Sequence, residues 1–255
     1  MSSPASGIEC SGLSRSYGSR QALADLNLVV PRGTLTVLLG SNGAGKTTLL
    51  KILATLVLPT RGQAAILGQN VVAHGLAARR LLGFVPAEER SFFGRLTVLQ
   101  NLEFFAALHG LSRGQCWARS ERSLADLGLG AQRSTPFAEL SSGMKQSLAL
   151  VRSLLHDPPV LLLDEPTRSL SPDLALRAQV LLRSLVREEG RTVLLATHNL
   201  GEAEALADQV AILHGGRIMG EGEPASLADS HGLPDSGRMA ALFTHFTNQA
   251  PEMDL

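Results

Sequence analysis

The chain has 255 residues, 44% hydrophobic and 18% charged, so it can bury a large core without disulfide or metal support. Its 23 basic and 23 acidic side chains balance, which argues against a nucleic-acid partner or a strongly acidic surface as a partner. The two cysteines, Cys10 and Cys116, lie far apart and outside any Cys/His cluster, which argues against zinc, a metal cluster and a disulfide framework.

Nothing in the sequence predicts a secretion signal or a membrane span. Residues 1–7 are rich in Ser, Pro and Ala and have neither a basic flank nor an apolar segment. The longest strongly apolar run, residues 52–58, is far shorter than the roughly 20 residues that a spanning helix needs. We therefore expect a cytoplasmic protein that reaches a membrane only through a partner.

The first quarter of the chain predicts strands and one helix. Residues 8–30 mix short apolar segments with turn residues and predict antiparallel strands, which end at the turn of residues 31–33. Residues 34–39 form a β-branched, apolar strand that ends at Gly40. Residues 46–58 have helical apolar spacing until Pro59. The order is strand, loop, helix.

The middle of the chain predicts a helical lobe, and the last part returns to alternating strands and helices. Three helices are expected in the middle, at residues 97–108, 119–127 and 141–155. Two short apolar strands follow, at residues 160–163 and 192–196, with a helix at residues 174–186 between them. Because strands alternate with helices, we predict an α/β fold with a parallel sheet. From about Pro234 the composition is loop-like.

The loop after the first buried strand matches the phosphate-binding pattern GxxxxGK[ST] in the required strand-to-helix context. Its residues are Gly40, Ser41, Asn42, Gly43, Ala44, Gly45, Lys46 and Thr47. Glycines let consecutive N–H groups point into one hollow, and the following helix adds its positive end. We expect Lys46 to reach the β- and γ-phosphates, Thr47 to bind Mg²⁺ and Thr48 to contact the α-phosphate. The alternative is a glycine-rich turn with an accidental lysine.

Two adjacent acids, Asp164 and Glu165, end the strand predicted at residues 160–163, at the edge where a parallel sheet presents functional groups. Asp164 is suited to hold Mg²⁺, and Glu165 to orient or deprotonate an attacking water. The alternative is that the acids cap the next helix, since Pro166 and Thr167 also indicate a turn.

With these motifs the chain, from about residue 8 to residue 224, resembles the nucleotide-binding subunits of ATP-binding-cassette (ABC) transporters. The third motif is a helix start that resembles the family signature: Leu140, Ser141, Ser142, Gly143, Met144, Lys145 and Gln146. A cap hydroxyl and free N–H groups at a helix start bind anions. The resemblance implies that Ser141, Ser142, Gly143 and Met144 contact the γ-phosphate held by a second subunit in a head-to-tail dimer. The alternative is a plain cap formed by Ser141.

The resemblance adds two single residues to the ATP site. His198, after the strand at residues 192–196, resembles the switch histidine that contacts the γ-phosphate; a lone histidine at a strand end usually has no such role. Tyr17 resembles the aromatic residue that stacks on adenine; the alternative is a tyrosine packed under the sheet.

Three motifs depart from the family pattern, at four positions. Ala87 stands where the family has a glutamine, and Glu88 or Glu89 is the nearest residue that offers an oxygen. Ser171 replaces a usual aspartate in the segment that contacts the other subunit. The signature has Ser142 and Met144 in place of Gly and Gln, as in exporters of drugs, antibiotics and polysaccharides. We therefore expect hydrolysis to survive but to be slower or differently coupled.

The resemblance implies a P-loop NTPase core with N-terminal antiparallel strands and an inserted helical lobe, all in one domain spanning residues 1–255. The core comprises residues 8–86 and 155–224, the lobe residues 87–154, and a C-terminal extension residues 225–255. The expected function is ATP hydrolysis, with ATP and Mg²⁺, in an exporter whose permease is a separate polypeptide at the cytoplasmic face of the membrane. The alternatives are a soluble ABC ATPase and a weakly hydrolysing regulatory subunit.

The expected permease contact is a groove beside residues 88–96. Phe92, Phe93 and Leu96 are the candidates to line it, and the alternative is that they belong to the core of the helical lobe.

Overall fold

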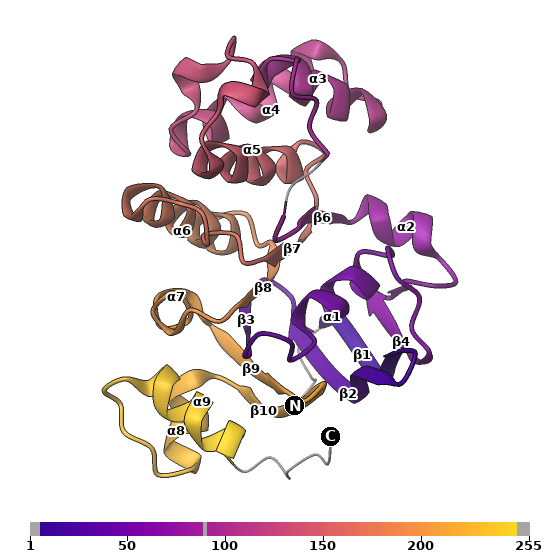
Figure 1. Cartoon of the computed structure of the whole chain (residues 1–255), viewed down its shortest axis with the longest axis vertical. Coiled ribbons are helices and arrows are strands. Elements are labelled where there is room, and N and C mark those ends of the chain that lie inside the picture. The colour runs from indigo at the N-terminus through magenta and orange to yellow at the C-terminus, as the bar shows by residue number, and fades with distance from the viewer. Residues whose placement is uncertain (1–5, 89–90, 249–255) are drawn as a thin grey trace.

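A central sheet of six strands organises the chain (Figure 1). The computed structural model describes residues 6–88 and 91–248. The strand order is β10-β9-β3-β8-β7-β6, and all neighbours are parallel except β10 with β9. The strands are β3 (Leu35–Leu39), β6 (Leu82–Val85), β7 (Val160–Asp164), β8 (Thr192–Thr197), β9 (Gln209–His214) and β10 (Arg217–Gly222). The predicted α/β fold with a parallel sheet is confirmed.

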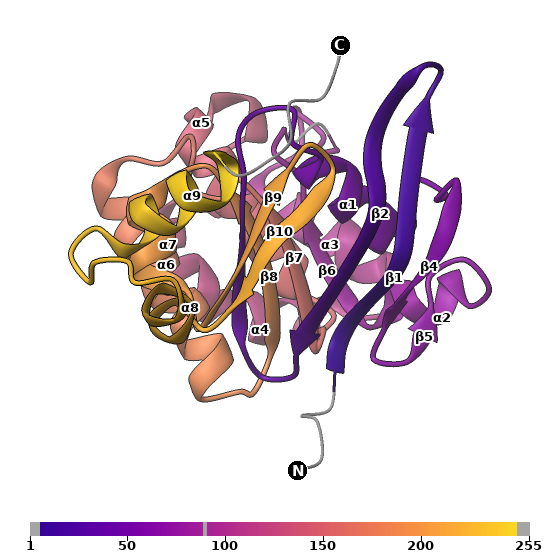
Figure 2. The ribbon, with the colours of Figure 1, turned by 90° about the horizontal axis from the view of Figure 1, so that it is seen from below.

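A second, antiparallel sheet lies beside the central one (Figure 2). Its order is β2-β1-β4-β5, with β1 (Ser6–Tyr17), β2 (Arg20–Pro31), β4 (Arg61–Ile66) and β5 (Gln69–Asn70). The strands β1 and β2 form a hairpin whose tight turn contains Gly18 in the left-handed region, at φ 59°. The antiparallel strands predicted for residues 8–30 are confirmed.

The helices fall into two groups (Figure 1). Three of them form the lobe that the sequence predicts: α3 (Val98–Leu108), α4 (Arg113–Asp126) and α5 (Ser142–Leu154). The others lie along the sheets: α1 (Lys46–Leu53), α2 (Gly75–Arg80), α6 (Pro172–Arg187), α7 (Leu200–Leu206), α8 (Pro224–Ser230) and α9 (Arg238–Asn248). Two short 3₁₀ turns, Gly130–Gln132 and Phe137–Glu139, link α4 to α5. Within the described ranges, no helix combines the length and apolarity needed to cross a bilayer.

The core explains why the central strands are continuous apolar runs. Every residue of β3, β7 and β8 is buried, because both faces of the sheet are covered. Successive residues point to opposite faces, so Val37 and Leu39 join the core beneath α5 and α6, whereas Leu38 joins the core beneath α1. Burial on both faces fixes the strand ends, from which the functional side chains project.

Three sequence predictions about helices are wrong: two concern where a helix begins or ends, and one concerns a stretch that was not expected to be helical. The first helix ends at Leu53, before Leu58, because Thr55 takes φ 62° and its N–H bonds back to Ile52. The second lobe helix begins at Arg113, not at residue 119, because Ser112 caps it and Gln115 completes a capping box. The stretch after Pro234 is not loop-like throughout, because α9 buries Met239, Leu242 and Phe246 against the rest of the chain.

Candidate active site at the phosphate loop

The phosphate loop, residues 40–45, joins β3 to α1, as the sequence predicts. Close packing explains two of its glycines. A Cβ at Gly45 would lie 2.6 Å from the carbonyl oxygen of Ala22, and one at Gly40 would lie 2.7 Å from that of Leu213. Gly45 also takes φ 114°, which other residues avoid. The loop is therefore held tightly between the two sheets.

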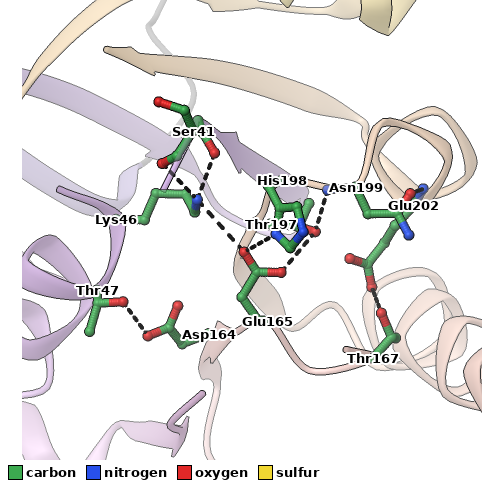
Figure 3. A network of polar contacts seen from close by, with 11 residues as sticks. Ser41, Lys46, Thr47, Asp164, Glu165, Thr167, Thr197, His198, Asn199 and Glu202 are labelled. Atoms are coloured by element: carbon green, nitrogen blue, oxygen red, sulfur yellow. Dashed lines mark hydrogen bonds and ion pairs between the residues drawn. The ribbon is translucent and has the colours of Figure 1, made fainter. Parts of the chain in front are cut away.

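Lys46 folds back over this loop. Its Nζ donates to the carbonyl oxygens of Gly40 at 2.6 Å and Ser41 at 3.2 Å, and lies 3.6 Å from Glu165 Oε1 (Figure 3). Burial lowers the pKa of Lys46, while the nearby carboxylates of Glu165 and Asp164 raise it. A buried ammonium group with only partial charge compensation is suited to an anionic ligand.

A cavity of about 290 Å³ opens beside the loop. It is lined by Tyr17, Arg20, Ala22, Gly43, Gly45, Lys46, Thr47 and Thr48. Tyr17 is 44% exposed and lines this cavity, so the alternative that it packs under the sheet is wrong. The other four predicted loop residues, Gly40, Ser41, Asn42 and Ala44, shape the loop but do not line this cavity.

Three residues around this cavity were missed by the sequence analysis. Arg20 and Ala22 line it because the β1–β2 hairpin returns past Tyr17. The guanidinium of Arg15 covers one face of the Tyr17 ring, 4.5 Å from its centroid. Arg20 follows Tyr17 after a glycine turn, which is a local hairpin signal; Arg15 carries no sequence signal of this contact.

Asp164 ends β7 and faces Thr47 across the sheet edge. Thr47 Oγ1 donates to Asp164 Oδ2 at 2.8 Å. The other oxygen, Oδ1, is buried and has no hydrogen-bond partner among the described residues. Burial raises the pKa of Asp164, and the bond from Thr47 lowers it. An unpaired buried carboxylate oxygen next to a hydroxyl group is the donor set expected for Mg²⁺.

Glu165 turns out of the strand toward Lys46 and His198. It takes φ 50°, and its N–H bonds to the carbonyl of Ala196 at 2.9 Å. His198 Nδ1 lies 2.7 Å from Oε1, and Thr197 Oγ1 donates to Oε2 at 3.4 Å (Figure 3). A strained backbone conformation of this kind is typical of functional sites. Neither acid caps the next helix, because Ser171 occupies the cap position of α6.

The signature residues lie at the start of α5, in the helical lobe. Ser141 caps the helix and its Oγ accepts the N–H of Met144 at 3.2 Å. A Cβ at Gly143 would lie 3.1 Å from the carbonyl oxygen of Ser169, in the segment that follows Glu165. Ser142 occupies the first helical turn. None of the four predicted signature residues lines the cavity at the phosphate loop.

Two of the residues that depart from the family pattern, Ala87 and Ser171, lie next to β6 and at the start of α6. Ala87 is half-buried just beyond β6, and Glu88 is exposed. Glu89 lies outside the described residues. Ser171 makes no side-chain bond at the start of α6. The geometry therefore supplies no glutamine-like contact at Ala87.

Comparisons with known proteins identify the family of this chain. The profile of the family described as "ABC transporter" matches residues 23–168. The "Daunorubicin resistance ATP-binding protein DrrA3" of Streptomyces coeruleorubidus is 39% identical over 92% of this chain and 76% of its own length. The "Probable multidrug ABC transporter ATP-binding protein YbhF" of Escherichia coli (strain K12) is 38% identical over 86% of this chain. The matched region is only 38% of that relative's own length.

Two solved structures share the fold. One, described as the "Structure of ATP binding subunit of ABC transporter", has a TM-score of 0.85 and 31% identity over 94% of this chain and 98% of its own. The other, the "Dimeric Structure of MJ0796, a Bacterial ABC Transporter Cassette", has a TM-score of 0.78 and 26% identity over 85% of this chain and 98% of its own. Since the family profile covers more than half of the chain and these likenesses agree with it, the chain belongs to the ABC transporter family.

Proposed function

We propose that this chain binds and hydrolyses ATP as the energy-supplying subunit of an export complex. The observation that carries the proposal is the meeting of Lys46, Glu165 and His198 at one end of the phosphate loop. Lys46 comes from α1, Glu165 follows β7 and His198 follows β8, so three separate elements converge there. This is the arrangement that phosphoryl transfer to water needs: a cation for the phosphates and a base for the water.

Asp164 and Thr47 are the residues that would hold Mg²⁺. They fit the ion because Thr47 Oγ1 and Asp164 Oδ2 already meet, and Asp164 Oδ1 has no partner among the described residues. When bound there, the ion supplies positive charge against the phosphate oxygens. It would also favour the ionised form of Asp164, opposing the effect of burial on the pKa of this residue.

Glu165 is the proposed base. Its Oε1 is held by His198, and its Oε2 accepts the hydroxyl of Thr197, so the carboxylate orientation is fixed before substrate arrives. Glu165 would take a proton from the attacking water, while Lys46 exchanges the carbonyl oxygens of Gly40 and Ser41 for phosphate oxygens. His198 is half-exposed, which leaves it accessible to the γ-phosphate.

The complete site is proposed to need a second subunit. Ser141, Ser142, Gly143 and Met144 present a helix start but do not line the cavity of their own chain. The similar cassette MJ0796 is described as dimeric. We infer that this helix start contacts the γ-phosphate held by a second copy or by a related cassette, with one ATP at each shared site.

The experiment compares Lys46→Ala with Lys51→Ala, which removes an exposed lysine from the same helix. Lys46→Ala should weaken ATP binding by about tenfold or more, because a buried charge-assisted contact is lost. It should also abolish phosphate release. Lys51→Ala should keep both. Binding of a fluorescent ATP analogue and phosphate release measure the two quantities, and equal affinities in all three proteins would refute the proposed site.

Transport is proposed to run through a separate permease at the cytoplasmic face of the membrane. Relatives named for daunorubicin resistance and for Nod factor export support an export role. The docking face is an exposed apolar surface made of Leu76, Phe93, Phe104 and Leu108, each at least 41% exposed. Phe93 and Phe104 pack edge to face at 4.8 Å. Phe92 is only 9% exposed and belongs to the lobe core instead.

The docking face adjoins a cavity of about 670 Å³ between α2 and the lobe. Its lining residues are Leu76, Arg79, Arg80, Leu108, His109, Leu111, Arg119 and His156. Three of these are arginines and none is acidic, so the permease segment that docks there should carry carboxylates next to apolar side chains. Such a segment would be held in two ways: its apolar side chains would pack on the docking face, and its carboxylates would pair with the arginines of the cavity.

Reversing two charges tests this docking proposal. The double substitution Arg79→Glu and Arg80→Glu should reduce co-purification of the permease by about tenfold or more, since attraction becomes repulsion. ATP affinity should not change. Arg217→Glu, on the edge strand β10, is the matched control and should retain the permease. Equal recovery of the permease with the double variant and with the control would rule out the Arg79–Arg80 surface as the docking site.

A further inference from the structure

Glu202 is a buried acid whose role the proposed hydrolysis leaves open. It lies in the first turn of α7, four residues after His198, and is only 2% exposed. Thr167 Oγ1 donates to its Oε1 at 2.8 Å (Figure 3). Its Oε2 has no hydrogen-bond partner in the described part of the chain. A buried carboxyl group with one unpaired oxygen is costly and calls for an explanation.

Two routes connect Glu202 to Glu165. One runs along the chain, since Thr167 follows Glu165 by two residues and bonds directly to Glu202. The other runs through hydrogen bonds of Asn199 and Thr197. Asn199 Oδ1 accepts the N–H of Glu202 at 3.2 Å, the N–H of Asn199 bonds to Thr197 Oγ1 at 3.0 Å, and Thr197 bonds to Glu165. Glu165, Thr167, Thr197, Asn199 and Glu202 therefore form a closed polar ring.

The same ring reaches the signature helix. The segment after Thr167 is folded by bonds from the N–H of Arg168 to the carbonyl of Glu165 and from the N–H of Leu170 to the carbonyl of Thr167. This turn presses the carbonyl of Ser169 against Gly143. Fixing Thr167 therefore fixes two things. One is the position of Glu165, the proposed base, and the other is the contact of Ser169 with Gly143 in the signature helix.

We infer that Glu202 is a positioning residue that fixes Thr167, and through it the turn between Glu165 and the signature helix. This inference rests on the proposed hydrolytic function of the site. Glu202 does not touch the phosphate-loop cavity, so its loss should alter turnover but not ATP binding.

The surroundings of Glu202 shift its pKa. Burial is the main influence and raises the pKa, whereas the hydroxyl of Thr167, which donates to Oε1, lowers it. Glutamine keeps the length of the Glu202 side chain, and its carbonyl oxygen can accept the hydroxyl of Thr167 as Oε1 does.

The test uses the full chain in its complex and measures phosphate release against ATP concentration. Glu202→Ala and Thr167→Val should each lower kcat by about tenfold, with KM for ATP within about twofold. The double variant should lose no more than either single variant, because both break one contact. Glu202→Gln and Thr167→Ser should restore at least half of kcat. Glu204→Ala is the control, because Glu204 lies on the same helix and accepts the N–H of Met239, outside the ring.

Hydrogen exchange gives a readout that does not depend on hydrolysis. The amides of Arg168 and Leu170 should exchange faster in Glu202→Ala and Thr167→Val, and at the normal rate in Glu204→Ala. Unchanged exchange or unchanged kcat in Glu202→Ala would overturn the inference, as would an equal loss of kcat in Glu202→Gln. Failure of the proposed function is distinct, because the wild-type protein itself would then release no phosphate.

Discussion

The guanidinium group of Arg15 packs against one face of the Tyr17 ring. Arg15 places its guanidinium 4.5 Å from the ring centroid, and its Nη1 donates to the carbonyl of Leu58 at 3.0 Å. Arg15 Nε is buried and has no partner among the described residues. One face of the ring is therefore covered, and the side chain lines the phosphate-loop cavity. An adenine stacked on the free face would meet a ring already fixed in place.

Arg15→Ala should weaken ATP binding by about twofold to fivefold, which corresponds to the roughly 0.5–1 kcal/mol expected for an exposed cation–π contact. Free phosphate and triphosphate should bind as before, because the contact concerns the base. Binding of a fluorescent ATP analogue provides the measurement. Arg32→Ala, in the turn before β3, is the control. An affinity that falls in Tyr17→Ala but stays constant in Arg15→Ala would show that the arginine does not position the ring.

At the scale of elements, a stacked pair of histidines joins the end of α3 to the connection between α5 and β7. His109, at the end of α3, and His156 lie with ring centroids 4.0 Å apart and planes at 3°. His156 Nε2 donates to the carbonyl of Leu82 at 3.0 Å, and its Nδ1 is buried without a partner among the described residues. Burial, followed by the charges of His109, Arg119 and Arg191, lowers the pKa of His156 to about 4, while the bond to Leu82 raises it.

This pair should make the fold sensitive to acid. The pKa of His156 lies below its ordinary value of 6.5, so between pH 6.5 and about 4 the unfolded chain binds more protons than the folded chain. Its contribution to stability is therefore complete above about pH 6.5 and is lost as the pH falls toward 4. The loss is on the order of 2 kcal/mol after allowance for partial exposure.

Thermal unfolding from pH 7 to pH 4.5 measures the effect. The melting temperature of the wild-type protein should fall more steeply than that of His156→Gln, which cannot take up a proton at this position. Parallel curves for the two proteins would mean that other groups dominate the acid response.

Elements whose sequence pattern is dictated by burial on both faces could be predicted. The strands β3, β7 and β8 are continuous apolar runs because helices and the second sheet cover them, and this pattern is visible without a structure. The helix α9 was not predicted, although its buried residues Met239, Leu242 and Phe246 follow the helical spacing i, i+3, i+7. Its place is set by tertiary contact, since Phe246 packs directly over Gly220 of β10.

At the scale of the whole molecule, the meeting of the site residues follows from topology. Lys46, Glu165 and His198 come after three parallel strands, whose carboxyl ends share one edge of the sheet. That convergence could be predicted from strand order. Two supporting residues could not, because Arg15 donates to Leu58 and Glu202 accepts from Thr167, and no local pattern indicates these contacts between distant segments.

In the whole molecule, the helix start at Ser141 and the phosphate loop are separate. The helix start lies in the lobe, and the phosphate loop lies between the two sheets. In the proposed dimer, a head-to-tail pair of chains would bring the helix start of one chain to the phosphate loop of the other. Hydrolysis is therefore proposed to occur in the assembled complex.

Phosphate release from the assembled complex, compared between wild type and Glu165→Gln, tests the central claim most directly. The amide keeps the shape of the side chain but cannot accept a proton, so release should fall by about 100-fold or more while ATP still binds. The wild-type complex should release phosphate continuously. Equal rates in the two proteins would contradict the role of Glu165 as the base and would favour a subunit that binds ATP without hydrolysing it at this site.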